Sequence, residues 1–252
     1  MPRGSQPEVE RRSRPEMRII PSVLVFTAAL LLGPGLLRVT AADDDGVALG
    51  ILYDTSGSMK DQVPNSSGST SPKYIIANHA LKAIANQIQV FTTNGATGDP
   101  RKVDVGLFTF EGEGAKPIVK LGPFDAAAIE KWTRDFNAPK GGTPLGNALR
   151  TVASSVLNSP MPRKHILVIT DGMNTVGPDP AQVLPAINRS AEKKQSAVFI
   201  HFIAFDVDAK VFDSVKKQGA TVAAAADESQ LNAQLDFILQ NQILLEKPST
   251  TK

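Results

Sequence analysis

The chain has 252 residues, of which 42% are hydrophobic, and a formal net charge of +2, so it can form one sizeable core. Arginines concentrate in the first 42 residues, which leaves the rest of the chain close to neutral and without the basic surface of a nucleic-acid-binding protein. The lack of cysteine excludes disulfides, thiolate metal ligands, a cysteine nucleophile and a cysteine-linked lipid anchor.

Residues 1–42 have the layout of a secretory signal peptide. A polar, arginine-bearing stretch precedes an apolar run over residues 19–37, and small residues follow. We expect cleavage after Ala41 or Ala42 and export of the protein to the periplasm, the cell surface or the medium. The alternative is a retained single-pass anchor, although a Gly-Pro-Gly sequence interrupts the apolar run. Residues 43–252 are then expected to form a single domain.

The first strands and helix are predicted from apolar patterning. Residues 47–53 form an almost continuous apolar run, which is typical of a strand buried on both faces of a parallel sheet. Ser71 and Pro72 are interpreted as the N-cap and first residue of a helix. Residues 103–110 alternate more and predict a strand nearer an edge, and a short turn makes residues 116–121 its antiparallel partner.

The second half of the chain continues the alternation of helices and strands. Thr143 and Pro144 open one of these helices, with Thr143 as its N-cap. The predicted elements are, in chain order, helix 126–136, helix 143–157, strand 165–170, helix 180–194, strand 197–205, helix 211–218, strand 220–226 and a helix from Asp227 to Leu245. The last helix is expected to bury one face, consisting of Leu231, Leu235, Ile238 and Leu245.

This alternation predicts an α/β fold with a doubly wound, mostly parallel six-stranded sheet, one antiparallel edge strand and helices on both faces, as in Rossmann-like folds. Ligands of such sheets bind outside the carboxyl ends of the strands. Asp54 directly follows the first strand, and Asp171 directly follows the strand at residues 165–170. Both carboxylates are therefore expected at the same edge of the sheet.

Hydroxyl groups join these carboxylates. Ser56 and Ser58 follow Asp54 at positions i+2 and i+4, which places one carboxylate and two hydroxyls on a single tight loop. Oxygen ligands without nitrogen or sulfur suit Mg²⁺, Mn²⁺ or Ca²⁺ rather than zinc or copper. Taken alone, the two serines would be ordinary loop residues, and Asp171 would belong to an ordinary turn.

Three segments together are more specific than any one of them. They are Asp54-x-Ser56-x-Ser58, Gly141-Gly142-Thr143-Pro144-Leu145 and Thr170-Asp171-Gly172. In this order they resemble the metal-ion-dependent adhesion site of von Willebrand factor type A domains, over about residues 46–246. The resemblance implies that the hydroxyls of Ser56, Ser58 and Thr143 bind a divalent cation directly, and that Asp54 and Asp171 act mainly through bound water. It also implies Mg²⁺, with Mn²⁺ or Ca²⁺ as alternatives, and a partner's Asp or Glu carboxylate as the last ligand.

Nearby polar residues receive ordinary roles. Asp208 is interpreted as the cap of a short helix, and Asp206 as a solvated neighbour or, alternatively, a support for the metal ligands. The histidines at positions 79, 165 and 201 lack ligand spacing and are not expected to bind metal. Residues 60–71 are rich in Gly and Ser and predict a flexible loop at the rim of the site.

We therefore expect a monomeric, exported, metal-dependent protein-binding domain of the adhesion type, and not an enzyme. Neither a P-loop nor a G-x-S-x-G sequence occurs, and Ser56 stands where an aspartyl phosphotransferase would carry a second Asp. We expect no nucleic-acid partner, and membrane contact only through an uncleaved leader. One alternative is a docking subunit of a chelatase or ATPase-linked complex, which would have no use for a leader. Another is a structural domain with an unused metal site.

Overall fold

The computed structural model describes residues 46–94 and 101–245. The predicted signal peptide and its boundary with the domain lie outside these residues. Within the described ranges, no helix is both long and apolar enough to cross a membrane.

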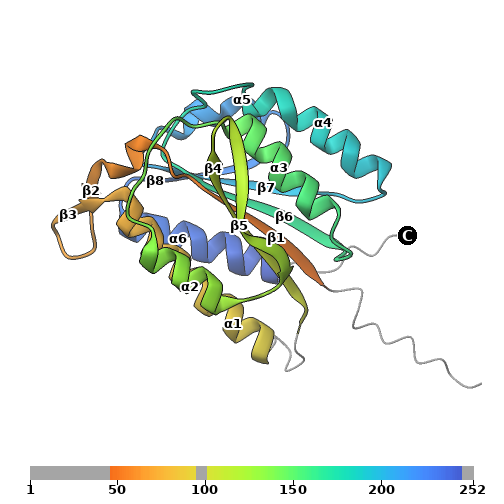
Figure 1. The fold of residues 1–252 in the computed structure, drawn as a ribbon, viewed down its shortest axis with the longest axis horizontal. Helices are drawn as coiled ribbons and strands as arrows, with labels where there is room; N and C mark the ends of the chain where they lie inside the picture. The colour runs from red at the N-terminus through yellow and green to blue at the C-terminus, as the bar shows by residue number, and fades with distance from the viewer. Residues whose placement is uncertain (1–45, 95–100, 246–252) are drawn as a thin grey trace, which may run out of the picture. The chain divides into compact units, whose positions relative to one another are not determined.

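The main sheet has six strands in the order β5-β4-β1-β6-β7-β8 (Figure 1). The pair β4 and β5 is antiparallel, and every other neighbouring pair is parallel. The bounds of these strands are Val47–Tyr53 for β1, Val103–Glu111 for β4, Gly114–Pro123 for β5, Arg163–Thr170 for β6, Phe199–Phe205 for β7 and Thr221–Ala225 for β8. The predicted mostly parallel sheet with one antiparallel edge strand is confirmed.

Helices cover both faces of this sheet. In Figure 1, α1, α2 and α6 lie on one face, and α3, α4 and α5 lie on the other. The helices span Lys73–Asn94 (α1), Ala126–Asp135 (α2), Leu145–Leu157 (α3), Pro180–Lys193 (α4), Asp213–Lys216 (α5) and Glu228–Ile238 (α6). Short 3₁₀ helices span Gly57–Lys60 and Ala209–Phe212, and Leu239–Leu244 forms a π-helix.

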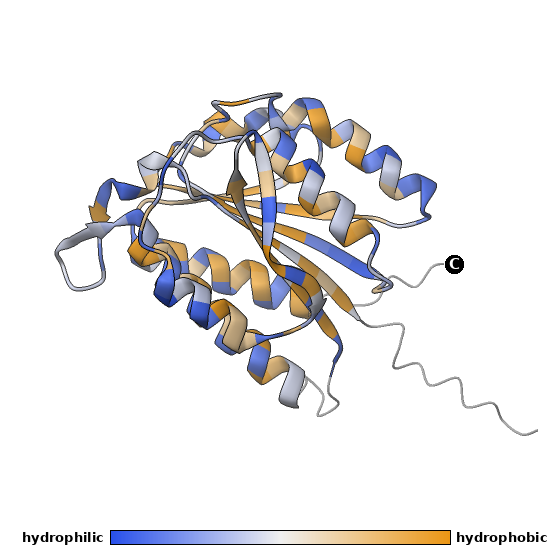
Figure 2. Cartoon of the chain, viewed as in Figure 1, coloured by the Kyte–Doolittle hydropathy of each residue, from blue (hydrophilic) through white to orange (hydrophobic). Residues whose placement is uncertain are grey.

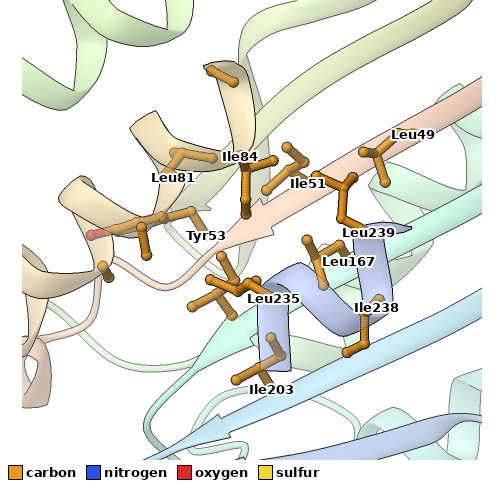
Figure 3. Close-up of a cluster of buried hydrophobic side chains, with 14 of the residues drawn as sticks. Leu49, Ile51, Tyr53, Leu81, Ile84, Leu167, Ile203, Leu235, Ile238 and Leu239 are labelled. Atoms are coloured by element: carbon orange, nitrogen blue, oxygen red, sulfur yellow. The ribbon is translucent and has the colours of Figure 1, made fainter. Parts of the chain in front are cut away.

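Strand β1 lies between two hydrophobic clusters, because successive side chains of a strand point to opposite faces. Leu49, Ile51 and Tyr53 pack under α1 and α6 (Figure 3), whereas Ala48 and Leu52 pack under α3 and α4. All seven residues of β1 are buried. The hydropathy colouring shows the central strands as predominantly apolar (Figure 2). The continuous apolar run in the sequence thus corresponds to a strand covered on both faces.

The end of the last helix differs from the prediction. Leu231, Leu235 and Ile238 are buried as expected, but Leu245 is 47% exposed. The chain passes from α6 into the π-helix, whose i→i+5 bonding adds a residue to each turn. This change of period places Ile243 and Leu244 in the core and carries Leu245 to the surface.

The predicted flexible loop after the first strand also contains regular structure. Gln62–Pro64 (β2) pairs antiparallel with Thr70–Pro72 (β3). Between them, the Asn65 side chain accepts from the backbone N–H groups of Ser67 and Ser69 and donates to Ser71. Because Ser71 and Pro72 belong to β3, helix α1 begins at Lys73 and not at the predicted proline.

Candidate metal centre

Asp54 and Asp171 lie side by side at the carboxyl edge of the sheet. They follow β1 and β6, which are parallel neighbours with Tyr53 paired to Ile169. The backbone N–H of Asp54 donates to the carbonyl of Ile169 at 3.0 Å. Both aspartates are buried, with exposed fractions of 0% and 6%. The two carboxylates therefore lie close together at a largely solvent-excluded position. This agrees with the expectation that both follow parallel strands at the same edge of the sheet.

The Asp54 carboxylate is held by its own loop and by β6. Its Oδ1 accepts from the Ser56 backbone N–H at 2.7 Å, and its Oδ2 accepts from Thr170 Oγ1 at 2.6 Å. Burial, together with the charge of Asp171, raises the pKa of Asp54 to about 6 against the opposing effect of these hydrogen bonds. The ionised form lacks sufficient compensation from the protein, so a cation at this position would stabilise it.

The two serine hydroxyls connect the loop after β1 to Asp171. Ser56 Oγ lies 3.1 Å from Ser58 Oγ, which donates to Asp171 Oδ1 at 2.9 Å. Ser56 is buried, whereas Ser58 is exposed. The structure thus places four of the predicted site residues, including Asp54, in one hydrogen-bonded group. Every candidate ligand atom in this group is oxygen.

Thr143 reaches the same place from the loop before α3. The backbone N–H of Gly57 donates to the Gly141 carbonyl at 3.0 Å, which ties the two loops together. A methyl group on Gly172 would lie 3.9 Å from Thr143 Oγ1 and 4.0 Å from Ser58 Oγ, so both hydroxyls face this glycine. Thr143 is buried, with 3% of its surface exposed. The structure therefore brings the fifth predicted residue to the group.

The predicted capping role of Thr143 is wrong. Pro144 occupies the N-cap position of α3, with φ of −86° and ψ of 53°, and no side chain caps the helix. Thr143 is instead fixed through its backbone, because its N–H donates to Thr175 Oγ1 and its carbonyl accepts from the Thr175 N–H. Its side-chain hydroxyl takes no part in these two contacts.

Lys73 is the main residue of this region that the sequence analysis missed. Its Nζ lies 3.0 Å from Asp171 Oδ2 and 3.0 Å from Asp206 Oδ2, and its side chain is only 5% exposed. Burial lowers the pKa of Lys73, but the hydrogen bonds to Asp171 and Asp206 outweigh this effect and raise it. Asp206 is solvent-exposed as expected, with 41% of its side chain accessible, but it is also an ion-pair partner of Lys73. Asp208 is a helix cap as predicted, but it caps the 3₁₀ helix at Ala209–Phe212 and not a helix that begins at Val211.

Two of the histidines form a pair elsewhere in the sheet. His165 Nδ1 lies 3.2 Å from His201 Nε2, and His201 Nδ1 lies 2.7 Å from Thr221 Oγ1. Burial lowers the pKa of His165 to about 3 and that of His201 to about 4. Across the described ranges, no cluster of three or more His, Cys, Asp or Glu residues could hold a metal ion. The candidate centre depends instead on two carboxylates and three hydroxyls.

A cavity of about 590 Å³ lies beside the candidate centre. Thr55, Gly141 and Gly142, which adjoin the predicted ligands in the sequence, form one part of its lining. Trp132 and Phe136, stacked with their ring centres 4.8 Å apart, form another. The lining also includes Lys116 and Lys140 and, among the described residues, no acidic side chain. The cavity combines an aromatic wall with positive charge.

Comparison with solved structures finds the same fold in surface proteins. The PilB minor pilin from Streptococcus sanguinis matches with a TM-score of 0.58 and 16% identity, over 77% of this chain and 60% of that one. The von Willebrand factor domain of the type V pili tip protein Mfa5 from Porphyromonas gingivalis matches with a TM-score of 0.56 and 14% identity, over 78% of this chain and 95% of that domain.

A third similar structure contains a metal. Proximal thread matrix protein 1 from the mussel byssus, solved with zinc in its metal-ion-dependent adhesion site, has a TM-score of 0.53 and 19% identity, over 78% of this chain and 48% of its own. A comparison with curated protein sequences found no match.

The family model of the von Willebrand factor type A domain matches residues 49–237. This range includes all five predicted site residues and runs from β1 into α6. The chain therefore belongs to the von Willebrand factor type A domain family.

Proposed function

We propose that this domain binds a divalent cation at the carboxyl edge of its sheet and uses it to hold a carboxylate of a protein partner. The observation that carries the proposal is the row of oxygen atoms formed by Ser56 Oγ, Ser58 Oγ and Asp171 Oδ1 beside the buried Asp54. Lys73 pairs with Asp171, but the two buried carboxylates need more compensating charge than one ammonium group supplies. A divalent cation would supply that charge.

The ligand set favours Mg²⁺, with Mn²⁺ and Ca²⁺ as alternatives. Ser56, Ser58 and Thr143 offer hydroxyl oxygens, and Asp54 and Asp171 offer carboxylates, which act mainly through bound water. Zinc, found in the mussel protein, usually takes nitrogen or sulfur ligands, so oxygen atoms alone make it the less suitable ion. With only two protein carboxylates, the bound cation would remain electrophilic enough to attract a third from a partner.

The neighbouring cavity suits the rest of such a partner. An acidic side chain would bind the metal, and an adjoining apolar side chain would pack against Trp132 and Phe136. Lys140 would attract a further acidic group. We infer a protein segment that carries both acidic and apolar residues. The proposed function is binding and not catalysis, by a monomeric domain. Its proposed location outside the cell agrees with the structural likeness to two pilus proteins.

Paired peptides test this function. A display of peptides that contain Asp or Glu, each matched to its Asn or Gln form, is exposed to the purified chain in Mg²⁺ and in EDTA. Peptides that bind only in Mg²⁺ and only in the acidic form support the proposal. Ser58→Ala should abolish this binding, while Ser155→Ala on α3 serves as the matched serine control. Equal binding of the acidic and amide forms would contradict metal-mediated carboxylate capture.

The same display tests the cavity. Lys140→Ala should weaken binding of the selected peptides without changing the affinity for Mg²⁺, because Lys140 lines the cavity and is not among the predicted metal ligands. Lys131→Ala, which alters an exposed lysine of α2, is the control. If both lysine variants bind the peptides as the wild type does, the cavity is not part of the binding surface.

A further inference from the structure

Lys73 and the candidate cation site engage different oxygens of one carboxylate. Asp171 Oδ1 accepts from Ser58 and faces the row of hydroxyls, whereas Asp171 Oδ2 accepts from Lys73 Nζ at 3.0 Å. The side chains of Asp171 and Lys73 are 0% and 5% exposed, so solvent screens their ion pair weakly. The ammonium group therefore contacts a different oxygen of Asp171 from the one that accepts from Ser58.

Lys73 is itself held in place by acidic groups. Its Nζ lies 3.0 Å from Asp206 Oδ2, in the turn after β7, and 3.9 Å from Asp61 Oδ2, before β2. Asp206 adopts a φ of +55°, a left-handed conformation that is uncommon for a non-glycine residue, and its backbone N–H donates to the Ala225 carbonyl. Lys73 thus joins the start of α1 to the turns after β6 and β7. An ordinary surface lysine would not have such a setting.

We propose that Lys73 is a resident counter-cation that lowers the affinity of the centre for metal and keeps a bound metal reactive toward an external carboxylate. This inference rests on the proposed metal-binding function. In the metal-free protein, Lys73 neutralises Asp171, which would otherwise be an uncompensated buried charge beside Asp54. When a divalent cation binds, it shares Asp171 with the ammonium group.

The sharing has two electrostatic consequences. The ammonium and the metal repel each other across the carboxylate, so metal binding is weaker than Asp54 and Asp171 alone would allow. Asp171 also neutralises less of the metal's charge, because part of its own charge is already compensated. The remaining positive charge increases the attraction for a carboxylate from a partner. Asp206 opposes both effects, because it compensates part of the charge of Lys73.

Calorimetric titration of Mn²⁺ into variants of the full chain tests this inference. Lys73→Met keeps the aliphatic bulk and removes the charge, so it should bind Mn²⁺ more tightly, on the order of tenfold, and its metal-free melting temperature should fall. Lys73→Arg should remain close to the wild type in both measurements. Asp206→Asn should weaken Mn²⁺ binding. Lys82→Met, an exposed lysine on the same helix, should change neither quantity.

Lys73→Met should raise the Mn²⁺ affinity and Asp206→Asn should lower it. These opposite changes distinguish the proposed role from simple structural support. Unchanged Mn²⁺ affinity in Lys73→Met would reduce the lysine to a structural ion-pair partner, and weaker affinity would mean that it orients Asp171 toward the metal. Either result overturns the inference. If Lys73→Met does not fold, the inference is tested on Asp206→Asn instead. An unchanged Mn²⁺ affinity in that variant also overturns the inference. A wild-type chain that binds no divalent cation would refute the proposed function itself.

Discussion

Ser58 Oγ donates a 2.9 Å hydrogen bond to Asp171 Oδ1, although the two residues are 113 positions apart in the chain. The contact exists because β1 and β6 are parallel neighbours, so the loops that follow them leave the same edge of the sheet. The family match and the fold explain why these segments meet. The chemistry proposed for them leads to the following predictions.

Asp54→Asn should stabilise the metal-free protein and abolish its response to metal. The pKa of Asp54 is raised to about 6, so the folded protein holds a proton more tightly than the unfolded chain does. The associated stability is present at acidic pH and is lost as the pH rises through about 6. At pH 7 the ionised group opposes folding by up to about 3 kcal/mol, which the amide removes. Urea unfolding with EDTA and with Mg²⁺ measures both effects.

Asp208→Asn is the control for this substitution. Asp208 lies near the same edge of the sheet, where it caps a 3₁₀ helix, and it is not a predicted ligand. This variant should retain the stabilisation by Mg²⁺, which is about 2.7 kcal/mol at a metal concentration 100 times the dissociation constant. If Asp54→Asn responds to Mg²⁺ as strongly as Asp208→Asn does, Asp54 is not part of the centre.

Gly141→Ala should weaken metal binding through the backbone alone. Gly141 has a φ of +85°, and an added methyl group would meet no atom within 4 Å, so strain in the left-handed conformation is the only steric consequence. That strain should lower the free energy of unfolding by about 1 kcal/mol. It should also shift the loop that carries Thr143, because the Gly141 carbonyl bonds to Gly57.

Gly219→Ala separates the two effects of this prediction. Gly219 has a φ of +92° and equally open surroundings, but it follows α5 and is not part of the candidate centre. Its replacement should lower stability by a similar amount and leave the Mn²⁺ affinity unchanged. Equal Mn²⁺ affinity in the two variants would mean that the conformation of Gly141 does not position Thr143.

The buried histidine pair should make the protein sensitive to acid. The pKa of His201 is lowered to about 4, so between about pH 6.5 and 4 the unfolded chain binds a proton that the folded protein does not. Stability is therefore present above about pH 6.5 and is lost as the pH falls toward 4. Between pH 7 and 5, the wild type should lose about 2 kcal/mol more than His201→Gln does. Identical losses in urea unfolding at the two pH values would show that His201 is readily protonated in the fold.

Leu239, at the start of the π-helix, should contribute far more to stability than Leu245, just after its end. Leu239 is fully buried there, so Leu239→Ala should reduce the free energy of unfolding by about 2–5 kcal/mol. Leu245→Ala should change it by less than about 0.5 kcal/mol, because Leu245 is 47% exposed. Thermal unfolding compares the two variants. A larger effect at Leu245 would support a regular α-helical continuation in place of the observed π-helix.

The sheet could be predicted because the burial of each strand is visible in its own local sequence pattern. A strand buried on both faces is predominantly apolar, as β1 and residues 166–169 of β6 are. The parallel arrangement then places Asp54 and Asp171 at one edge without further information. The burial of Leu245 could not be predicted in this way, because no local sequence pattern indicates the change from α- to π-helical bonding.

The missed features of the site depend on contacts between distant segments. Lys73 resembles any lysine in the first turn of an amphipathic helix, and only the turns after β6 and β7 make it a buried ion-pair partner. The histidine pair arises from the register of β6 on β7. His165 is paired with Phe199, so His201 lies two positions further along β7, on the same face of the sheet. Thr143 looked like a cap because Pro144 follows it, but the backbone angles of Pro144 place the proline itself at the N-cap.

The most direct test of the account is a calorimetric titration of Mg²⁺ into the metal-free chain, compared with the Ser56→Ala/Ser58→Ala double variant. The account predicts saturable binding with one ion per chain in the wild type and its loss in the double variant, because these hydroxyls are the proposed direct ligands. Removing them should leave the fold intact, since both serines lie in the loop and 3₁₀ helix that follow β1. If the folded double variant binds Mg²⁺ as tightly as the wild type, or if neither protein binds a divalent cation, the proposed centre does not exist.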